Sequence, residues 1–223
     1  MRSSVAADQA AGLRRHRGRR PLRCIHVFSD TADSAIQLAR ALHRLGRTAL
    51  LIDICGRAFF GSTTRSLFDC QQQLARNQLH LLPMPFGHAW SAQGVRADDP
   101  ALIMVARDYD CLLFDVCPEA SDWKPLPGGA HSAVLQVKHQ RASMLHGFSV
   151  LKTLSRLQDP VRVGLLGDTD ACDHLLAACV RFLDPSFGRS VYSVAREDDV
   201  FAALAVRMTE EETSPTARFI KQK

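Results

Sequence analysis

The feature that most constrains the fold of this chain is a regular alternation of short apolar runs with longer amphipathic segments. An apolar run at 24–28 precedes a segment at 31–45 whose apolar residues recur at helical spacing, and a second apolar run follows at 48–53. Near-continuous apolar runs are typical of strands covered on both faces, and strands that alternate with helices form parallel sheets. The sequence therefore predicts an α/β protein with a doubly wound, mainly parallel sheet.

The alternation continues toward the C-terminus. Further strands are predicted at 79–82, 111–115, 133–137, 161–166 and 190–194. Further helices are predicted at 62–76, 100–107, 141–157, 169–183 and 198–208. The segment 83–99, rich in Pro, Gly and Ala, is expected to be a surface loop. A length of 223 residues with 46% hydrophobic residues fits one globular domain.

The positive charge of the chain is concentrated at its N-terminus. Residues 1–23 hold seven Arg and one Asp, whereas the complete chain has a formal net charge of +5, so residues 24–223 sum to −1. An anionic partner would therefore meet a basic arm and not a basic face of the folded body. We expect three segments, namely the arm 1–23, an α/β domain at 24–209 and a tail at 210–223, and no specific nucleic-acid binding.

Other features exclude several classes of protein. The seven cysteines form no C-x-x-C pair and lie mostly in apolar runs, so we predict buried structural thiols. The nine histidines show no metal-binding spacing, and no metal site is predicted. No window approaches the roughly 18 consecutive apolar residues of a membrane span, and no secretory signal is evident, so we expect a cytoplasmic protein.

Acidic residues follow three of the predicted strands. Asp53 and Asp115 each end a strand, and Asp168 follows a third. In sheets of this kind ligands bind at the carboxyl ends of the strands, which favours a functional site there. An Asp after a strand also serves as the N-cap of the next helix. Both interpretations stay open for each of the three residues.

Several segments resemble the MinD/ParA group of deviant P-loop ATPases. The segment 34–53 is similar to the first helix and second strand of that family, and Asp115 is similar to its Walker B acid. Further similarity lies at 80–83, 149–156, 194–204 and 214–218, so the resemblance extends over about 24–218. It implies a P-loop NTPase-like fold of the SIMIBI/MinD type and places Asp53 and Asp115 at catalytic positions.

The arm resembles a narrower branch of this family. Asp8, Gln9, Ala10, Leu13 and Arg14 match the D-Q-A-x-x-L-R element of flagellar-number regulators of the FlhG/FleN type. In that family the element docks on the signal-recognition-type GTPase FlhF and stimulates its GTP hydrolysis. The resemblance implies an FlhF-type GTPase as partner, a role in flagellum biogenesis, and recruitment to the cell pole or flagellar base. Gln9 would orient the attacking water and Arg14 would meet developing phosphate charge.

The phosphate-binding position departs from the family pattern. A phosphate loop needs glycines, a Lys and a Ser or Thr. The positions here are Ser29, Asp30, Thr31, Ala32, Asp33 and Ser34. They offer neither Gly nor Lys, and their two carboxylates repel an anion, although an Asp there suits the N-cap of the next helix. Glu119 also replaces a switch glycine, and Asp168 stands where the family reads adenine with Asn.

These departures predict that ATP binding is lost or weak and that Asp53 and Asp115 are relics in catalytic positions. No cofactor is expected, except Mg-ATP if the loop is still competent. The favoured hypothesis is a regulator that activates FlhF through its arm and uses its body as a protein-binding platform, and not an enzyme. Flagellar switch or C-ring proteins, or a flagellar transcription regulator, would be partners of the body, and a homodimer stays open.

Two alternative functions stay open. One is an active MinD-like ATPase switch with an unusual phosphate loop, which dimerises on ATP. The other is a degenerate MinD-like accessory protein of polysaccharide secretion. The Arg cluster of the arm would, in a further alternative, bind acidic lipid or nucleic acid through phosphate contacts. Membrane association through the tail is expected to be weak at most, because Phe219 and Ile220 are its only large apolar anchors.

Overall fold

A computed structural model describes residues 23–58, 80–82, 100–106, 108–118, 126–127, 129–157, 159 and 161–210. The predicted helix at 62–76, the loop at 83–99, the tail beyond 210 and all but the last residue of the arm lie outside this part of the chain.

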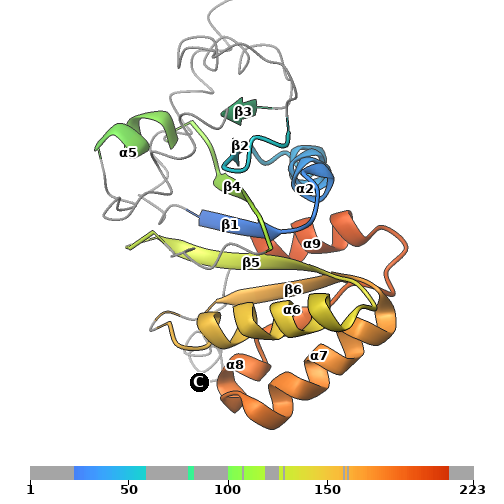
Figure 1. The fold of residues 1–223 in the computed structure, drawn as a ribbon. Coiled ribbons are helices and arrows are strands. Elements are labelled where there is room, and N and C mark those ends of the chain that lie inside the picture. The colour runs from blue at the N-terminus through green and yellow to red at the C-terminus, as the bar shows by residue number, and fades with distance from the viewer. Residues whose placement is uncertain are drawn as a thin grey trace, which may run out of the picture.

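The described residues form one seven-stranded sheet (Figure 1). The strands are β1 Arg23–Phe28, β2 Ala49–Asp53, β3 His80–Leu82, β4 Cys111–Val116, β5 Ala130–Val137, β6 Arg162–Gly167 and β7 Val191–Ser193. Their order is β3-β2-β4-β1-β5-β6-β7, and every adjacent pair is parallel. The predicted parallel α/β sheet is confirmed, with strand boundaries close to those expected.

Helices cover both faces of the sheet. They are α2 Asp33–Arg44, α5 Pro100–Ala106, α6 Arg141–Leu154, α7 Thr169–Phe182, α8 Pro185–Gly188 and α9 Val200–Thr209. Helices α2 and α9 pack together on one face, whereas α6 and α7 pack together on the other (Figure 1). The short helix α8 was not predicted; Asp184 caps it by accepting a hydrogen bond from the Ser186 amide. No described helix is long and apolar enough to cross a membrane.

One hydrophobic cluster lies on each face of the sheet. In β1, Cys24 and Phe28 belong to one cluster and Ile25 and Val27 to the other, because successive side chains of a strand point to opposite faces. The same alternation explains why β4 is buried along its whole length. The buried cysteines Cys24, Cys111, Cys172 and Cys179 pack in these clusters as predicted, whereas Cys55 and Cys117 are half-buried.

Gly167 sets the turn from β6 into α7. Its φ is +116°, and a Cβ there would lie 2.2 Å from the carbonyl oxygen of Val137. Only glycine accommodates both the backbone conformation and this close approach to β5. The turn brings Asp168 to the first turn of α7, at the carboxyl edge of the sheet.

Two histidines are in contact where β1 meets β5: His26 is buried and His131 is half-buried. Nε2 of His26 lies 3.1 Å from Nδ1 of His131, and Nε2 of His131 lies 2.7 Å from the carbonyl oxygen of Leu126. Because a carbonyl only accepts, Nε2 of His131 donates to it, and Nδ1 of the neutral ring accepts from His26. The ring of His26 also stacks on Phe114, at a centroid distance of 4.9 Å.

Candidate functional site at the carboxyl ends of the strands

The two acids predicted at catalytic positions lie side by side. Asp53 of β2 and Asp115 of β4 are paired in register at the carboxyl ends of their strands. Asp53 is 2% exposed and Asp115 is fully buried. Two buried carboxylates at neighbouring positions repel each other and need compensating donors. The structure therefore brings together the residues that the sequence placed at this edge.

The compensating group is Arg57, which the sequence interpretation missed. Nη2 of Arg57 donates to Oδ1 of Asp115 at 2.7 Å, and Nε donates to Oδ2 at 3.3 Å. Nη1 donates to the carbonyl oxygen of Ser29, at the end of β1, at 2.8 Å. The guanidinium thus bridges β4 and the loop after β1 and binds both carboxylate oxygens in the fork geometry typical of arginine.

Asp53 holds the loop that carries Arg57. Its two carboxylate oxygens accept hydrogen bonds from the amides of Arg57 at 3.0 Å and Ala58 at 3.1 Å. The acid therefore closes the turn that follows β2, in the manner of an N-cap, and aims the Arg57 side chain at Asp115. Asp53 has a structural function in this arrangement, and its oxygens serve the chain's own backbone.

The electrostatics of the pair follow from burial. Burial raises the pKa of Asp115, the Arg57 guanidinium partly offsets that rise, and Asp53 adds to it. Partial burial lowers the pKa of Arg57, but its hydrogen bonds and charge contact with Asp115 outweigh this, so the net pKa is raised. Arg57 therefore favours the ionised form of Asp115 against the effect of burial.

The loop between β1 and α2 has a packing function. Ser29 is fully buried, and its Oγ donates to the carbonyl oxygen of Thr31 at 2.6 Å. Asp30 forms an ion pair with Lys138, which follows β5. The expected Asp N-cap is wrong for this helix: Ala32 occupies the N-cap position with a helical φ of −66°, and no side chain caps it. Asp33 and Ser34 are the first two residues of α2.

Asp168 is the N-cap of α7. Its Oδ1 accepts a hydrogen bond from the Ala171 amide at 2.9 Å and lies 3.5 Å from Nδ1 of His139. The N-cap interpretation is confirmed for this residue. The residues predicted for the GTPase-activating element, Asp8, Gln9, Ala10, Leu13 and Arg14, lie outside the described residues, as do Glu119, Phe219 and Ile220.

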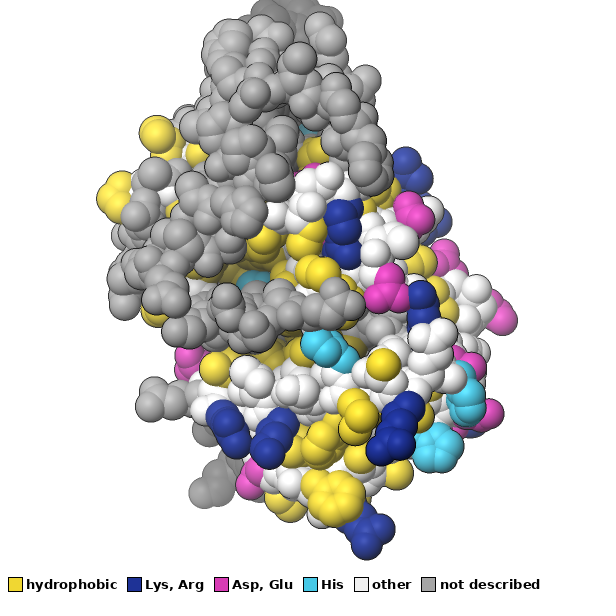
Figure 2. Space-filling view, viewed as in Figure 1, with side chains coloured by type: hydrophobic (Ala, Val, Ile, Leu, Met, Phe, Trp, Pro, Cys, Tyr) yellow, Lys and Arg dark blue, Asp and Glu magenta, His cyan; other side chains and the backbone are white. Residues whose placement is uncertain are grey.

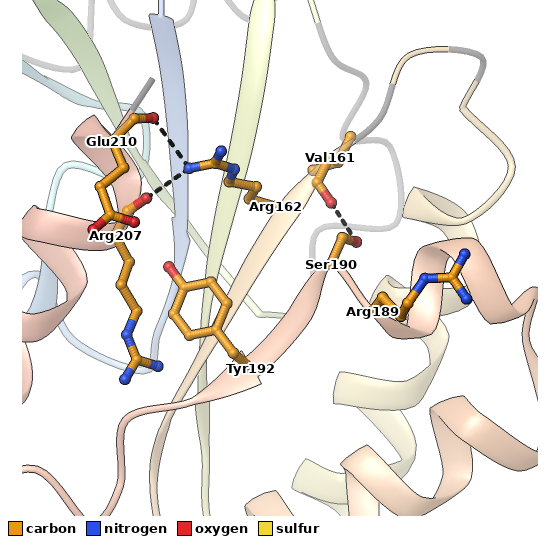
Figure 3. A pocket seen from close by; sticks show the side chains of 7 residues that line it. All are labelled: Val161, Arg162, Arg189, Ser190, Tyr192, Arg207 and Glu210. Carbon is orange, nitrogen blue, oxygen red and sulfur yellow. Dashed lines mark hydrogen bonds between the residues drawn. The ribbon is translucent and has the colours of Figure 1, made fainter. Parts of the chain in front are cut away.

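A cavity of about 360 Å³ lies at the opposite, amino-terminal edge of β6 and β7 (Figure 3). Its lining consists of Val161, Arg162, Arg189, Ser190, Tyr192, Arg207 and Glu210. Arg162 donates to the carbonyl oxygens of Arg207 and Glu210, and the Arg207 guanidinium binds Glu197. The arginines diverge in Figure 3 and do not converge on one point. This cavity is far from the site that the sequence predicted.

Comparison with known proteins finds several solved structures that are similar to this chain. No protein-family profile and no curated protein sequence matches the chain. One of the similar structures is that of a ParA family ATPase from Chlorobium tepidum TLS. It has 16% sequence identity and a TM-score of 0.44, and the match covers 85% of this chain and 93% of that chain.

Proposed function

We propose that this protein is a regulator of the MinD/ParA-like kind that does not turn over ATP and that stimulates an FlhF-type GTPase through its N-terminal arm. The observation that carries the proposal for the body is the ion pair of half-buried Arg57 with the fully buried Asp115. In P-loop NTPases, an acid at the end of a strand helps to hold the Mg²⁺ that bridges the phosphates. Here both oxygens of that acid are bound to the chain's own guanidinium.

Metal binding at Asp115 would require the ion pair to open. Removing Arg57 from a fully buried carboxylate leaves an uncompensated charge, which is costly in a protein interior. The loop at 29–34 supports the same conclusion, because it has no glycine or lysine and its Asp30 is paired with Lys138. The two cations that the structure describes at this edge, Arg57 and Lys138, are already paired with Asp115 and Asp30, so neither is free to bind a phosphate.

Calorimetric titration of the purified full chain with Mg-ATP, Mg-ADP and Mg-GTP tests the proposal for the body. We expect no heat of binding from any of the three. ATP turnover that depends on Mg²⁺ and disappears in Asp115→Ala would overturn the proposal. Micromolar binding together with nucleotide-dependent dimerisation would instead establish the ATPase-switch alternative.

The proposal for the arm rests on its D-Q-A-x-x-L-R sequence. Ala10, Leu13 and Arg14 recur at helical spacing, so they would share one side of a short helix. A helix this short is marginal in water and would fold on its partner. Orientation of the attacking water and stabilisation of phosphate charge are what GTPase activation supplies, and Gln9 and Arg14 have the chemistry for the two tasks.

The arm is tested by the steady-state GTP turnover of a purified FlhF-type GTPase with the full chain added. We expect Gln9→Ala to abolish the stimulation and Arg14→Ala to reduce it. Gln37→Ala, at an exposed position of α2, is the matched control and should stimulate like the wild type. Undiminished stimulation by Gln9→Ala would refute the assigned role, provided that its urea midpoint equals that of the wild type.

A further inference from the structure

Helices α6 and α7 present large apolar side chains to the solvent. Leu145 on α6 is 61% exposed, and Phe182 at the end of α7 is 66% exposed. Phe148 of α6 packs edge-on against Phe182, with ring centroids 6.3 Å apart, so the two helices contribute to one apolar surface. We refer to Leu145, Phe148 and Phe182 as the α6–α7 face.

Cations surround this face. Three exposed cations lie on or next to α6. Arg141 and Lys152 lie four and seven residues from Leu145, spacings that place them on the same side of the helix, and Arg156 lies in the turn that follows it. The guanidinium of Arg181 lies 5.2 Å from the centre of the Phe182 ring. Figure 2 shows the result, with hydrophobic side chains flanked by Lys and Arg on the lower part of the molecule. We refer to Arg141, Lys152, Arg156 and Arg181 as the cationic rim.

Little negative charge opposes the rim. Residues 123–158, which include all of α6, contain no Asp or Glu. The acids of α7, Asp170 and Asp173, lie in its first two turns, and Asp173 is bound to Arg196 at 2.6 Å. Two exposed acids lie nearer the rim in sequence: Asp159 follows Arg156 by three residues, and Asp184, the N-cap of α8, follows Arg181 by three. None of the four rim residues forms an ion pair with another described residue. The rim therefore has a positive charge that an external partner is able to neutralise.

We propose that the α6–α7 face binds an anionic lipid surface, with Leu145 and Phe182 inserted at the level of the headgroups and the cationic rim on the lipid phosphates. Anionic leaflets attract clustered Lys and Arg, and apolar side chains beside them add a hydrophobic contribution. The stems of Lys and Arg extend along apolar surface while their charges stay at the headgroups. A few such anchors give reversible binding.

Charge also decides between a lipid surface and a second copy of the chain. Two copies that met face to face would bring two cationic rims together, and the repulsion would oppose the contact. An anionic bilayer neutralises the rim and accepts protruding apolar side chains without a matching groove. This inference does not depend on the proposed function of the arm, and it concerns a surface separate from the carboxyl edge and the tail.

Co-sedimentation of the full chain with phosphatidylcholine vesicles containing increasing fractions of phosphatidylglycerol tests the proposal. We expect binding to rise with the anionic fraction and to fall with added salt. The double variant Leu145→Ser/Phe182→Ser should bind about tenfold more weakly or worse, because it loses the apolar anchors. Lys152→Gln/Arg156→Gln should weaken binding by about fivefold per charge removed.

Matched controls lie on the opposite face of the sheet. Val206→Ser changes an apolar residue of α9 that is 42% exposed, and Arg40→Gln/Arg44→Gln removes two exposed cations of α2. Both controls should bind vesicles like the wild type, since the basic arm and the tail contribute equally to every variant. Unfolding midpoints of all variants establish that each is folded.

Three results would overturn the proposal. The first is no sedimentation of the wild type with anionic vesicles. The second is equal binding by the face variants and the controls, which would assign the binding to the arm or tail. The third is a wild-type dimer in analytical ultracentrifugation that becomes monomeric in Leu145→Ser/Phe182→Ser with vesicle binding unchanged, because the face would then be a self-association surface.

Discussion

The carboxyl edge of the sheet and the α6–α7 face differ in how their charges are neutralised. At the carboxyl edge, Asp115 is fully buried and is bound to Arg57, while Asp53 is bound to the loop that carries Arg57. On the α6–α7 face, four exposed cations surround exposed apolar side chains and have no described ion-pair partner. The charges at the carboxyl edge are thus neutralised by residues of the chain itself. The charges of the α6–α7 face are left for a partner to neutralise. Acids at an expected position therefore do not define a site unless their contacts are also known.

Among the changes that test this comparison, removal of the Arg57 charge should have the largest effect on the free energy of unfolding. Arg57→Met leaves Asp115 buried without its counter-ion, and we expect the free energy of unfolding to fall by about 3 to 5 kcal/mol. Urea denaturation monitored by circular dichroism measures the loss. Arg44→Met, which breaks an exposed ion pair with Asp199, should change stability by less than about 1 kcal/mol.

The double variant Arg57→Met/Asp115→Leu provides a sharper test of the same pair. Because it removes both charges, it should recover much of the stability lost in Arg57→Met. A double variant as unstable as Arg57→Met would mean that Arg57 acts through packing and its bond to Ser29, and not through Asp115. Charge neutralisation of Asp115 would then not be what holds Arg57 at the carboxyl edge.

The contact of buried His26 with half-buried His131 predicts the next largest effect, through the pH dependence of stability. Burial lowers the pKa of His26 well below its usual value, and the charge of His131 lowers it further. Burial likewise lowers the pKa of His131. Unfolding therefore takes up protons below about pH 6.5, and stability that is complete above that pH should fall by up to about 1.4 kcal/mol per pH unit for each histidine.

His26→Gln should flatten this pH dependence, as measured by urea unfolding between about pH 7.5 and pH 5.5. His174→Gln, at an exposed position of α7, should keep the wild-type profile. The raised pKa of Asp115 acts in the opposite direction, because the folded protein takes up that proton first on acidification. An unchanged slope in His26→Gln would show that the histidine pair tolerates charge despite its burial.

The sequence predicted the fold better than it predicted the site. All seven strands and the helices α2, α5, α6, α7 and α9 were anticipated, because period and apolar runs are local signals. Asp53 and Asp115 were placed at strand ends for the same reason. The role of Arg57 depends on a contact across 58 residues of sequence, and no local pattern encodes such a contact. The only signal available in the sequence was that Asp115, an acid in a strand expected to be buried, has no cation close to it along the chain and therefore needs one from elsewhere.

Substitution of Asp168 should have an intermediate effect on stability. It stands where the resemblance places an adenine-reading Asn, yet in the structure it caps α7 through the Ala171 amide. Asp168→Ala should lower stability by about 1 kcal/mol, whereas Asp168→Ser should retain most of it, because serine is also a good N-cap. Thermal denaturation of the two variants measures the difference. Equal stability of Asp168→Ala and the wild type would contradict the structural function of this acid.

The smallest effect on the free energy of unfolding is expected on the α6–α7 face. Leu145→Ser replaces an exposed side chain of α6 and should change the free energy of unfolding by less than about 0.5 kcal/mol. Leu151→Ala, on the buried side of the same helix, should cost about 2 to 5 kcal/mol, because Leu151 is fully buried in the core. Urea denaturation of both variants measures the contrast. If Leu145→Ser cost as much as Leu151→Ala, Leu145 would be part of the packing of the domain, and the α6–α7 face would not be free to receive a partner.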